Sequence, residues 1–183
     1  MNLEKYTERA RGFVESAQSL ALRENHQRFT PEHVLKVLLD DEQGLAAGLI
    51  DRAGGHSRDA LAAVELALAK LPKVEGAGAG QLYLDPATAR IFDTAERIAE
   101  KAGDSFVTVE RLLLAVAMEK KSEAGRILSQ AGVTPALARI LPASAPFSSA
   151  SATSRRSTVT KESPAFSAIF SALSKIRAVV GAR

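Results

Sequence analysis

Apolar residues recur at helical spacing along most of the first 141 residues. Between Leu3 and Glu24 they lie three or four positions apart, on one face of a predicted helix that begins at Leu3 or Thr7. This face consists of Tyr6, Ala10, Phe13, Val14, Ala17, Leu20 and Ala21. The alternation typical of strands occurs only in short fragments such as residues 81–84. The pattern therefore predicts an all-α protein.

Cap residues and prolines mark where the other helices begin. Thr30-Pro31, Asp85-Pro86 and Thr134-Pro135 each place an N-cap side chain before a proline, which loses no hydrogen bond at the first helical position. Ser57, Thr108 and Ser122 are predicted as further N-caps. Together with the apolar stripes, these starts predict a short helix from Pro31. The other predicted helices cover residues 45–52, 57–71, 86–102, 109–119, 123–131 and 134–140.

The pattern occurs twice. A shift of 78 positions, the distance from Gly54 to Gly132, lays residues 13–54 over residues 91–132 without a gap. The identical residues in the first copy are Ala17, Ala21, Thr30, Glu32, Leu35, Ala46, Ala53 and Gly54. A glycine closes the third helix of each copy. Two copies of one unit can bury their apolar faces against each other, so the fold class is predicted as a duplicated four-helix repeat with about eight helices and pseudo-twofold symmetry.

Composition divides the chain into a folded part and a tail. Residues 1–141 are predicted to form one domain, with repeat one at 1–72, a linker at 73–84 that contains a glycine-rich hinge, and repeat two at 85–141. Residues 142–165 are rich in Ser, Ala and Pro and cannot bury enough apolar surface to offset the entropy of ordering, so they are predicted to be disordered. Residues 166–183 carry an apolar stripe that predicts an amphipathic helix.

The basic character of the chain belongs to its tail. The net charge is +3, but residues 1–141 carry 18 basic and 20 acidic side chains, and residues 142–183 carry six basic and one acidic. The tail lacks a dense basic cluster and interleaved aromatic residues, so neither nucleic acid nor a membrane is expected as a partner. There is no Cys, no apolar run of signal-peptide length and no run long enough to span a membrane. We expect a cytoplasmic protein.

No pattern for catalysis, cofactor binding or metal binding is present. His26, His33 and His56 share no ligand spacing, and His26 and His56 are predicted to be solvated turn residues. A G-x-x-x-x-G-K-[ST] motif is missing, and the glycines of residues 76–80 lack the lysine that would reach a phosphate. No Ser, His and acid arrangement is supported by spacing. The chain is therefore predicted not to be an enzyme and to need no cofactor or metal.

Two carboxylates of the second copy stand close to a predicted helix start. Asp104 and Glu110 flank Thr108, and a carboxylate in a first helical turn stabilises the helix by about 0.3–1 kcal/mol. Glu32 is expected to have this role in the first copy, where His26 occupies the place of Asp104. From the residues alone, capping is favoured over a functional role. Positions where the two copies differ are where a binding site is expected.

Four stretches of the chain resemble a known family. Residues 15–22 (ESAQSLAL), 29–35 (FTPEHVL), 71–76 (LPKVEG) and 103–115 (GDSFVTVERLLLA) resemble the N-terminal Clp repeat domain of the bacterial ClpB disaggregases, over about residues 1–140. The resemblance implies a globule of two pseudo-twofold four-helix repeats, tethered to two ATPase modules that form a hexameric ring. It also implies a domain that captures unfolded or aggregated polypeptides and works with an Hsp70-type chaperone system.

The resemblance also assigns candidate binding residues. Thr7, Asp104 and Glu110 match family positions that engage substrate, and alignment points to Val14 and Phe92 as apolar residues that line a groove. An apolar groove rimmed by polar groups binds extended hydrophobic peptides weakly and with little sequence preference. The resemblance therefore predicts a substrate-binding domain without catalytic residues of its own.

After Thr134-Pro135 the chain departs from the family pattern. One interpretation is a truncated or frameshifted gene, so that this chain lacks the ATPase modules and a hexamer is expected only where they are present. The alternative is a free-standing adaptor that docks on a Clp ring or another protein through its C-terminal helix. Deletion of residues 142–183 separates the two, because an adaptor should lose its partner and a peptide-binding domain should be unchanged.

Overall fold

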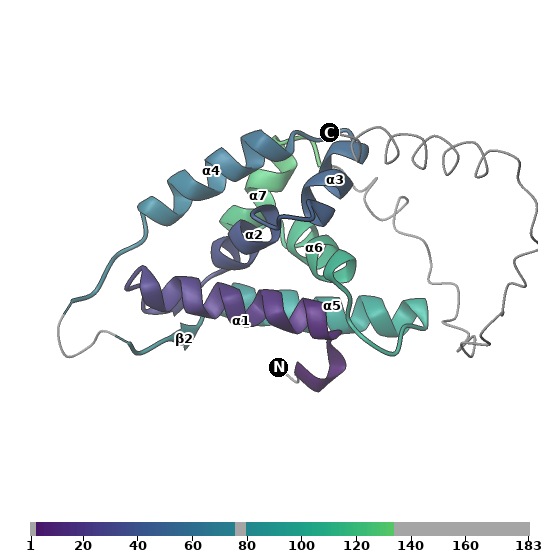
Figure 1. Ribbon diagram of the computed structural model, residues 1–183, viewed down its shortest axis with the longest axis horizontal. Coiled ribbons are helices and arrows are strands. Elements are labelled where there is room, and N and C mark those ends of the chain that lie inside the picture. The colour runs from purple at the N-terminus through teal and green to yellow at the C-terminus, as the bar shows by residue number, and fades with distance from the viewer. Residues whose placement is uncertain (1–2, 76–79, 134–183) are drawn as a thin grey trace, which may run out of the picture. The chain divides into compact units, whose positions relative to one another are not determined.

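The computed structural model describes residues 3–75 and 80–133, and most of these residues lie in helices (Figure 1). Within them, seven α-helices follow a short 3₁₀-helix, η1 (Leu3–Lys5). The α-helices are α1 (Glu8–Arg23), α2 (Pro31–Leu39), α3 (Leu45–Arg52), α4 (Ser57–Ala69), α5 (Pro86–Ala102), α6 (Val109–Met118) and α7 (Glu123–Gln130). The all-α prediction is confirmed. The predicted helix at 134–140 and the predictions for residues 142–183 lie outside the described residues.

Most of the predicted helix starts are confirmed. The side chains of Asp85, Thr108 and Ser122 accept a backbone N–H from the first turns of α5, α6 and α7. The predicted cap Ser57 is wrong, because Ser57 is the first residue of α4 and follows the N-cap. Its N–H and hydroxyl both donate to the carboxylate of Asp51, at 2.9 and 3.0 Å, so a carboxylate from the end of α3 accepts the first-turn N–H instead.

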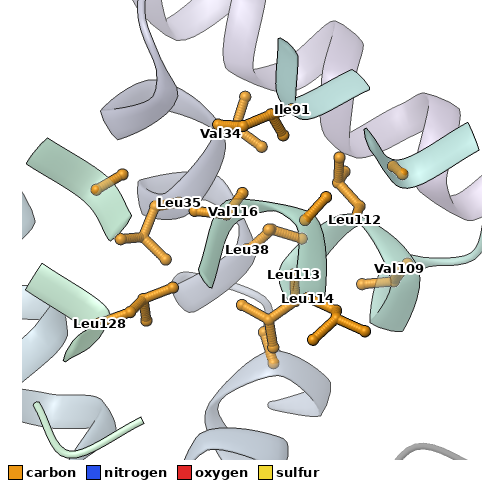
Figure 2. Close-up of a cluster of buried hydrophobic side chains, with 14 of the residues drawn as sticks. Val34, Leu35, Leu38, Ile91, Val109, Leu112, Leu113, Leu114, Val116 and Leu128 are labelled. Atoms are coloured by element: carbon orange, nitrogen blue, oxygen red, sulfur yellow. The ribbon is translucent and has the colours of Figure 1, made fainter. Parts of the chain in front are cut away.

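The two repeats share one core, in which α2 and α6 are the central helices. Both helices contact their own repeat's first helix and also each other. Figure 2 shows the side chains that meet there: Val34, Leu35 and Leu38 from α2, Leu112, Leu113 and Val116 from α6, with Ile91 and Leu128 beside them. These side chains are fully buried, and burial of each contributes about 1.5–3 kcal/mol. The prediction that two copies bury their apolar faces against each other is confirmed.

Short backbone pairings link each repeat to the start of the other. Strand β1 (Arg28–Phe29) lies in repeat one and pairs in parallel with β2 (Tyr83–Leu84), which precedes repeat two's first helix. An isolated parallel bridge joins Tyr6, which precedes repeat one's first helix, to Val107 of repeat two. Tyr6 and Leu84 are 78 positions apart, as are Phe29 and Val107. Each repeat therefore pairs its loop with the segment that precedes the other repeat's first helix. Residues 83–84, which the sequence predicted only as a strand-like fragment, form a strand that pairs with β1.

The N-cap residues of the two first helices reinforce this exchange. Thr7 donates its N–H to the carbonyl of Val107 at 3.0 Å, and its hydroxyl accepts the N–H of Ala10. Asp85, the equivalent N-cap, donates its N–H to the carbonyl of Phe29 at 3.1 Å. Each cap thus fixes its helix against the loop of the opposite repeat.

Candidate functional site

The junction between the start of α1 and the turn before α6 brings together the polar residues predicted to bind substrate. Thr7 is the N-cap of α1 and is bonded to Val107 in that turn. Asp104 lies in the same turn, and Glu110 lies in the first turn of α6. Thr7, from the start of the chain, therefore belongs to the same region of the fold as Asp104 and Glu110.

Asp104 is held in a buried ion pair. Arg111 Nε donates to Asp104 Oδ2 at 2.9 Å, and each side chain is only 9% exposed. A buried charge that loses its partner is costly, so this pair holds the α5–α6 turn against α6. Sequence reasoning missed Arg111, and it assigned Asp104 a role in substrate engagement without this structural one.

Repeat one has two histidines in the equivalent places. His26 and His33 lie 78 positions before Asp104 and Arg111, and Nδ1 of His26 is 2.9 Å from Nε2 of His33. The N–H of Thr30 donates to His33 Nδ1, so the proton of His33 is on Nε2 and is donated to His26. Between the two repeats, both residues of the pair are replaced together, and in each repeat they lie seven positions apart. This joint replacement is the sequence signal that could have revealed each pair.

His26 is buried, with 4% of its surface exposed, and the prediction that it is solvated is wrong. Asn25 adopts a positive φ of 58°, which turns the chain after α1, and Lys73 then forms an antiparallel bridge with His26. The histidine is covered by this segment and by its contact with His33. His56 is exposed, in agreement with the prediction.

The two equivalent glutamates differ in their partners. Glu32 lies in the first turn of α2, as expected. It is also buried, and its Oε1 accepts the N–H of Ala124 at 3.1 Å, so it caps α7 of the other repeat as well. Glu110 is half-buried and forms no hydrogen bond or ion pair with the part of the chain that the structure describes. The symmetry of the repeats would place the hydrogen-bond partner of Glu110 at the start of α3. There the N–H of Leu45 donates to the carboxylate of Asp41. Glu110 is thus available to bind a ligand.

Val14 and Phe92 lie in the hydrophobic core. Their exposed fractions are 0% and 1%, and the Phe92 ring packs edge to face against Tyr6 with centroids 6.3 Å apart. As placed, they do not line a groove. Their role in substrate binding stays a prediction.

A cavity of about 460 Å³ opens beside the α5–α6 turn. It is lined by apolar and charged residues, among them Lys5, Asp93, Glu96, Glu100, Phe106 and Val107. Phe106 is 52% exposed, which is unusual for an aromatic side chain and was not anticipated from the sequence. Lys5 pairs with Glu96 at 3.2 Å. The side chains of Asp93 and Glu100 have no ion pair within residues 3–75 and 80–133.

The described residues contain no group of three or more His, Cys, Asp or Glu side chains that could hold a metal ion. None of their helices combines the length and the apolar character needed to cross a membrane.

A family model, the Clp repeat (R) N-terminal domain, matches residues 5–131. The chain belongs to this family. Its Clp repeat domain is 71% identical over 135 residues to the chaperone protein ClpB of Rhodopseudomonas palustris, and 64% identical over 134 residues to that of Mesorhizobium japonicum. These matches cover 74% and 73% of this chain and 15% of each relative. The chain therefore spans a small part of the length of these ClpB proteins.

Solved structures confirm the fold of the Clp repeat domain. The Hsp104 N-terminal domain from Candida albicans is similar with a TM-score of 0.63 and 20% identity, over 73% of this chain and 85% of that one. The N-terminal domain of the ClpV1 ATPase from E. coli is similar with a TM-score of 0.62 and 20% identity, over 76% and 85%. At this identity the likeness establishes a common fold.

The buried histidines are expected to make the Clp repeat domain less stable in mild acid. Burial, with the neighbouring His26, lowers the pKa of His33 from 6.5 to about 4. Between these values the unfolded chain binds a proton at His33 that the folded chain does not. The free energy of unfolding is therefore greatest above pH 6.5, the pKa of His33 in the unfolded chain. It falls as the pH drops towards 4, by up to about 3 kcal/mol. Urea titrations at about pH 7 and about pH 5 measure this loss.

A glutamine at His33 is the matched control. His33→Gln keeps an acceptor at the third helical position, as in a capping box, but does not titrate. The pKa of His26 is also lowered by burial and by Lys73, and Glu24 faces it from α1, so part of the acid dependence remains in the variant. We expect a smaller loss of stability in His33→Gln between the two pH values. Equal losses in both proteins would contradict the assignment to His33.

Glu32, which caps α7 of the other repeat, is expected to contribute more to stability than Glu110, its equivalent in repeat two. Glu32→Ala leaves the buried N–H of Ala124 without an acceptor and should lower the free energy of unfolding by about 1–3 kcal/mol. Glu110→Ala removes no such bond and should change it by less than about 0.5 kcal/mol. The midpoints of urea unfolding compare the two variants, and similar losses would show that the cap is not what distinguishes them.

Proposed function

We propose that this Clp repeat domain captures exposed segments of unfolded or aggregated polypeptide as the N-terminal domain of a ClpB-type disaggregase. The observation that carries the proposal is the exposed Phe106 in a cavity beside Asp93 and Glu100, whose carboxylates form no ion pair within the described residues, at the junction that also holds Thr7 and Asp104. Exposed apolar surface rimmed by polar groups is typical of a binding site. The family membership and the similarity to ClpB chaperones support the same function.

Each residue of the junction has a proposed part in binding. Phe106 offers apolar contact area to a hydrophobic side chain, and Glu110 accepts hydrogen bonds from peptide N–H groups or pairs with a basic side chain. Thr7 and Asp104 hold the α1 start and the α5–α6 turn in position. Val14 and Phe92 support this surface from the core. One aromatic side chain and a few acceptors favour weak binding with little sequence preference.

The wider role rests on the family resemblance. We infer a domain of about residues 1–141 that passes captured polypeptide to ATPase modules in a hexameric ring, together with an Hsp70-type chaperone system in the cytoplasm. The domain itself supplies binding and no catalytic step. The carboxylates and the aromatic residue of the junction are suited to contact and orientation of a chain, which is what such a role requires.

A serine at Phe106 tests the site. Phe106→Ser should weaken the binding of the full chain to a reduced and alkylated, permanently unfolded protein by about fivefold or more, since it removes the apolar contact area. Leu66→Ser is the control, because Leu66 lies on α4, is 65% exposed and does not line the cavity. Fluorescence anisotropy of the labelled unfolded protein measures the dissociation constants. Unchanged binding by Phe106→Ser, or equal losses in both variants, would contradict the proposed site.

A further inference from the structure

An extended segment of the chain docks on the turn between α1 and α2 in repeat one. Lys73 forms an antiparallel bridge with His26, and Val74 donates its N–H to the carbonyl of Asn25 at 2.9 Å. The ammonium of Lys73 also pairs with the carboxylate of Glu24 at 2.9 Å. The segment is therefore bound by backbone pairing and by one basic side chain.

Apolar residues on both sides of Lys73 accompany this docking. Leu71, Pro72 and Val74 line a cavity of about 440 Å³ together with His26 of the turn. The docked segment thus has an apolar–basic–apolar pattern. It shows what kind of extended chain this turn can hold.

Repeat two contains the same turn without a docked segment in the described part of the chain. Gly103 and Asp104 take the places of Asn25 and His26, and Gly103 has a φ of 75° where Asn25 has 58°. Asp104 donates its N–H to the carbonyl of Ala99 at 2.9 Å, as His26 does to Ala21.

The edge of this turn is open. Gly103, Ser105 and Phe106 are exposed, and no group within residues 3–75 and 80–133 donates a hydrogen bond to the carbonyl of Gly103. In repeat one, the equivalent carbonyl is the acceptor for Val74. The backbone group that would receive a docked chain therefore has no donor among the described residues.

Charges around the open turn favour a basic chain. Asp93 and Glu100 line the adjoining cavity without an ion pair within the described residues, and Arg97 is the one cation of the lining that forms none there, so the unpaired charges of the cavity sum to −1. Phe106 stands where repeat one has Arg28, so a cation is replaced by an apolar ring. Both differences suit a segment with a basic residue between apolar ones.

We propose that the edge formed by residues 103–106 binds an extended peptide with an apolar–basic–apolar pattern, paired antiparallel as Lys73 and Val74 pair with repeat one. The inference rests on the proposed function and names the class of segment that the site selects. The peptide N–H bonds to the carbonyl of Gly103, its basic residue faces Glu100 and Asp93, and an apolar residue contacts Phe106.

A peptide copied from the docked segment provides the probe. An acetylated and amidated peptide with the sequence of residues 69–75 (AKLPKVE) is titrated into the isotope-labelled full chain, and amide shifts are followed by NMR. The shifts should cluster at residues 103–106. N-methylation at the position of Val74 removes the bonding N–H and should weaken binding roughly tenfold.

Matched controls separate backbone pairing from charge. N-methylation at the position of Lys73, whose N–H points away in this type of bridge, should change the affinity by less than about twofold. Glu100→Lys should weaken binding roughly tenfold, whereas Glu42→Lys, the same charge change at an exposed residue outside the cavity, should change it less than about twofold.

The outcomes distinguish this inference from the proposed function. Shifts at residues 25–28 in place of 103–106, or equal effects of the two N-methyl groups, would overturn the inference. If the chain binds unfolded protein but the probe leaves residues 103–106 unshifted, the inference is wrong and the proposed function stands. If the probe binds there but unfolded protein does not bind, the edge is a peptide site and the proposed function is wrong.

Discussion

Gly125→Ala is expected to destabilise the domain more than alanine at any other glycine of the described residues. A Cβ at Gly125 would lie 2.2 Å from the carbonyl oxygen and 2.7 Å from the carbonyl carbon of Glu119, the C-cap residue that follows α6. These are backbone atoms, so relief requires α6 and α7 to move apart. We expect a loss of about 3 kcal/mol or more in the free energy of unfolding, measured by urea titration.

The glycine of α3 provides a control of opposite sign. A Cβ at Gly48 meets no atom within 4 Å, and Gly48 lies inside a helix, where alanine is favoured over glycine. Gly48→Ala should therefore raise the free energy of unfolding by about 0.5–1 kcal/mol. If both substitutions destabilise equally, the close approach of α7 to the end of α6 is not the cause.

Asp104→Ala is expected to have the second large effect. It breaks the ion pair with Arg111, in which each side chain is only 9% exposed, and removal of one partner of a buried ion pair typically costs about 3–5 kcal/mol. In the double variant Asp104→Ala with Arg111→Met, no charge remains, and much of this loss should be recovered. Urea titration of the single and double variants measures the difference. Equal stability of Asp104→Ala and the double variant would contradict a role for the ion pair.

This prediction affects how binding data on Asp104 are interpreted. A variant that loosens the α5–α6 turn also displaces Phe106 and residues 103–106, so it would lose affinity without any direct contact between Asp104 and the ligand. Variants at Phe106 and Glu110 break no hydrogen bond or ion pair within residues 3–75 and 80–133, and they therefore report on binding more directly.

The fold was predictable because its signals are local and repeated. The shift of 78 residues predicted two units around one core, and the bounds predicted for α3 and α5, residues 45–52 and 86–102, agree with the structure. Helix starts and stops depend on caps, prolines and glycines within one turn, and these can be read from a few residues. Gly54 and Gly132, both with a φ of 83°, show this at the ends of the third helices.

The candidate site was less predictable because it depends on contacts between distant residues. Glu32 caps a helix 92 residues further along, and His26 is buried by a segment that begins beyond α4. Helical spacing also does not tell how deep an apolar residue lies. Val14 and Phe92 occupy apolar positions but lie in the core, whereas Phe106 occupies a turn and is exposed.

Photo-crosslinking from position 106 is the most direct test of polypeptide capture by the α5–α6 turn. A benzophenone side chain at position 106 of the full chain is irradiated with one protein in two forms, native and permanently unfolded, and position 66 serves as the control. We predict crosslinks to the unfolded form from position 106, few to the native form and few from position 66. Equal crosslinking of both forms, or equal yields from the two positions, would contradict the proposed capture of unfolded polypeptide at this site.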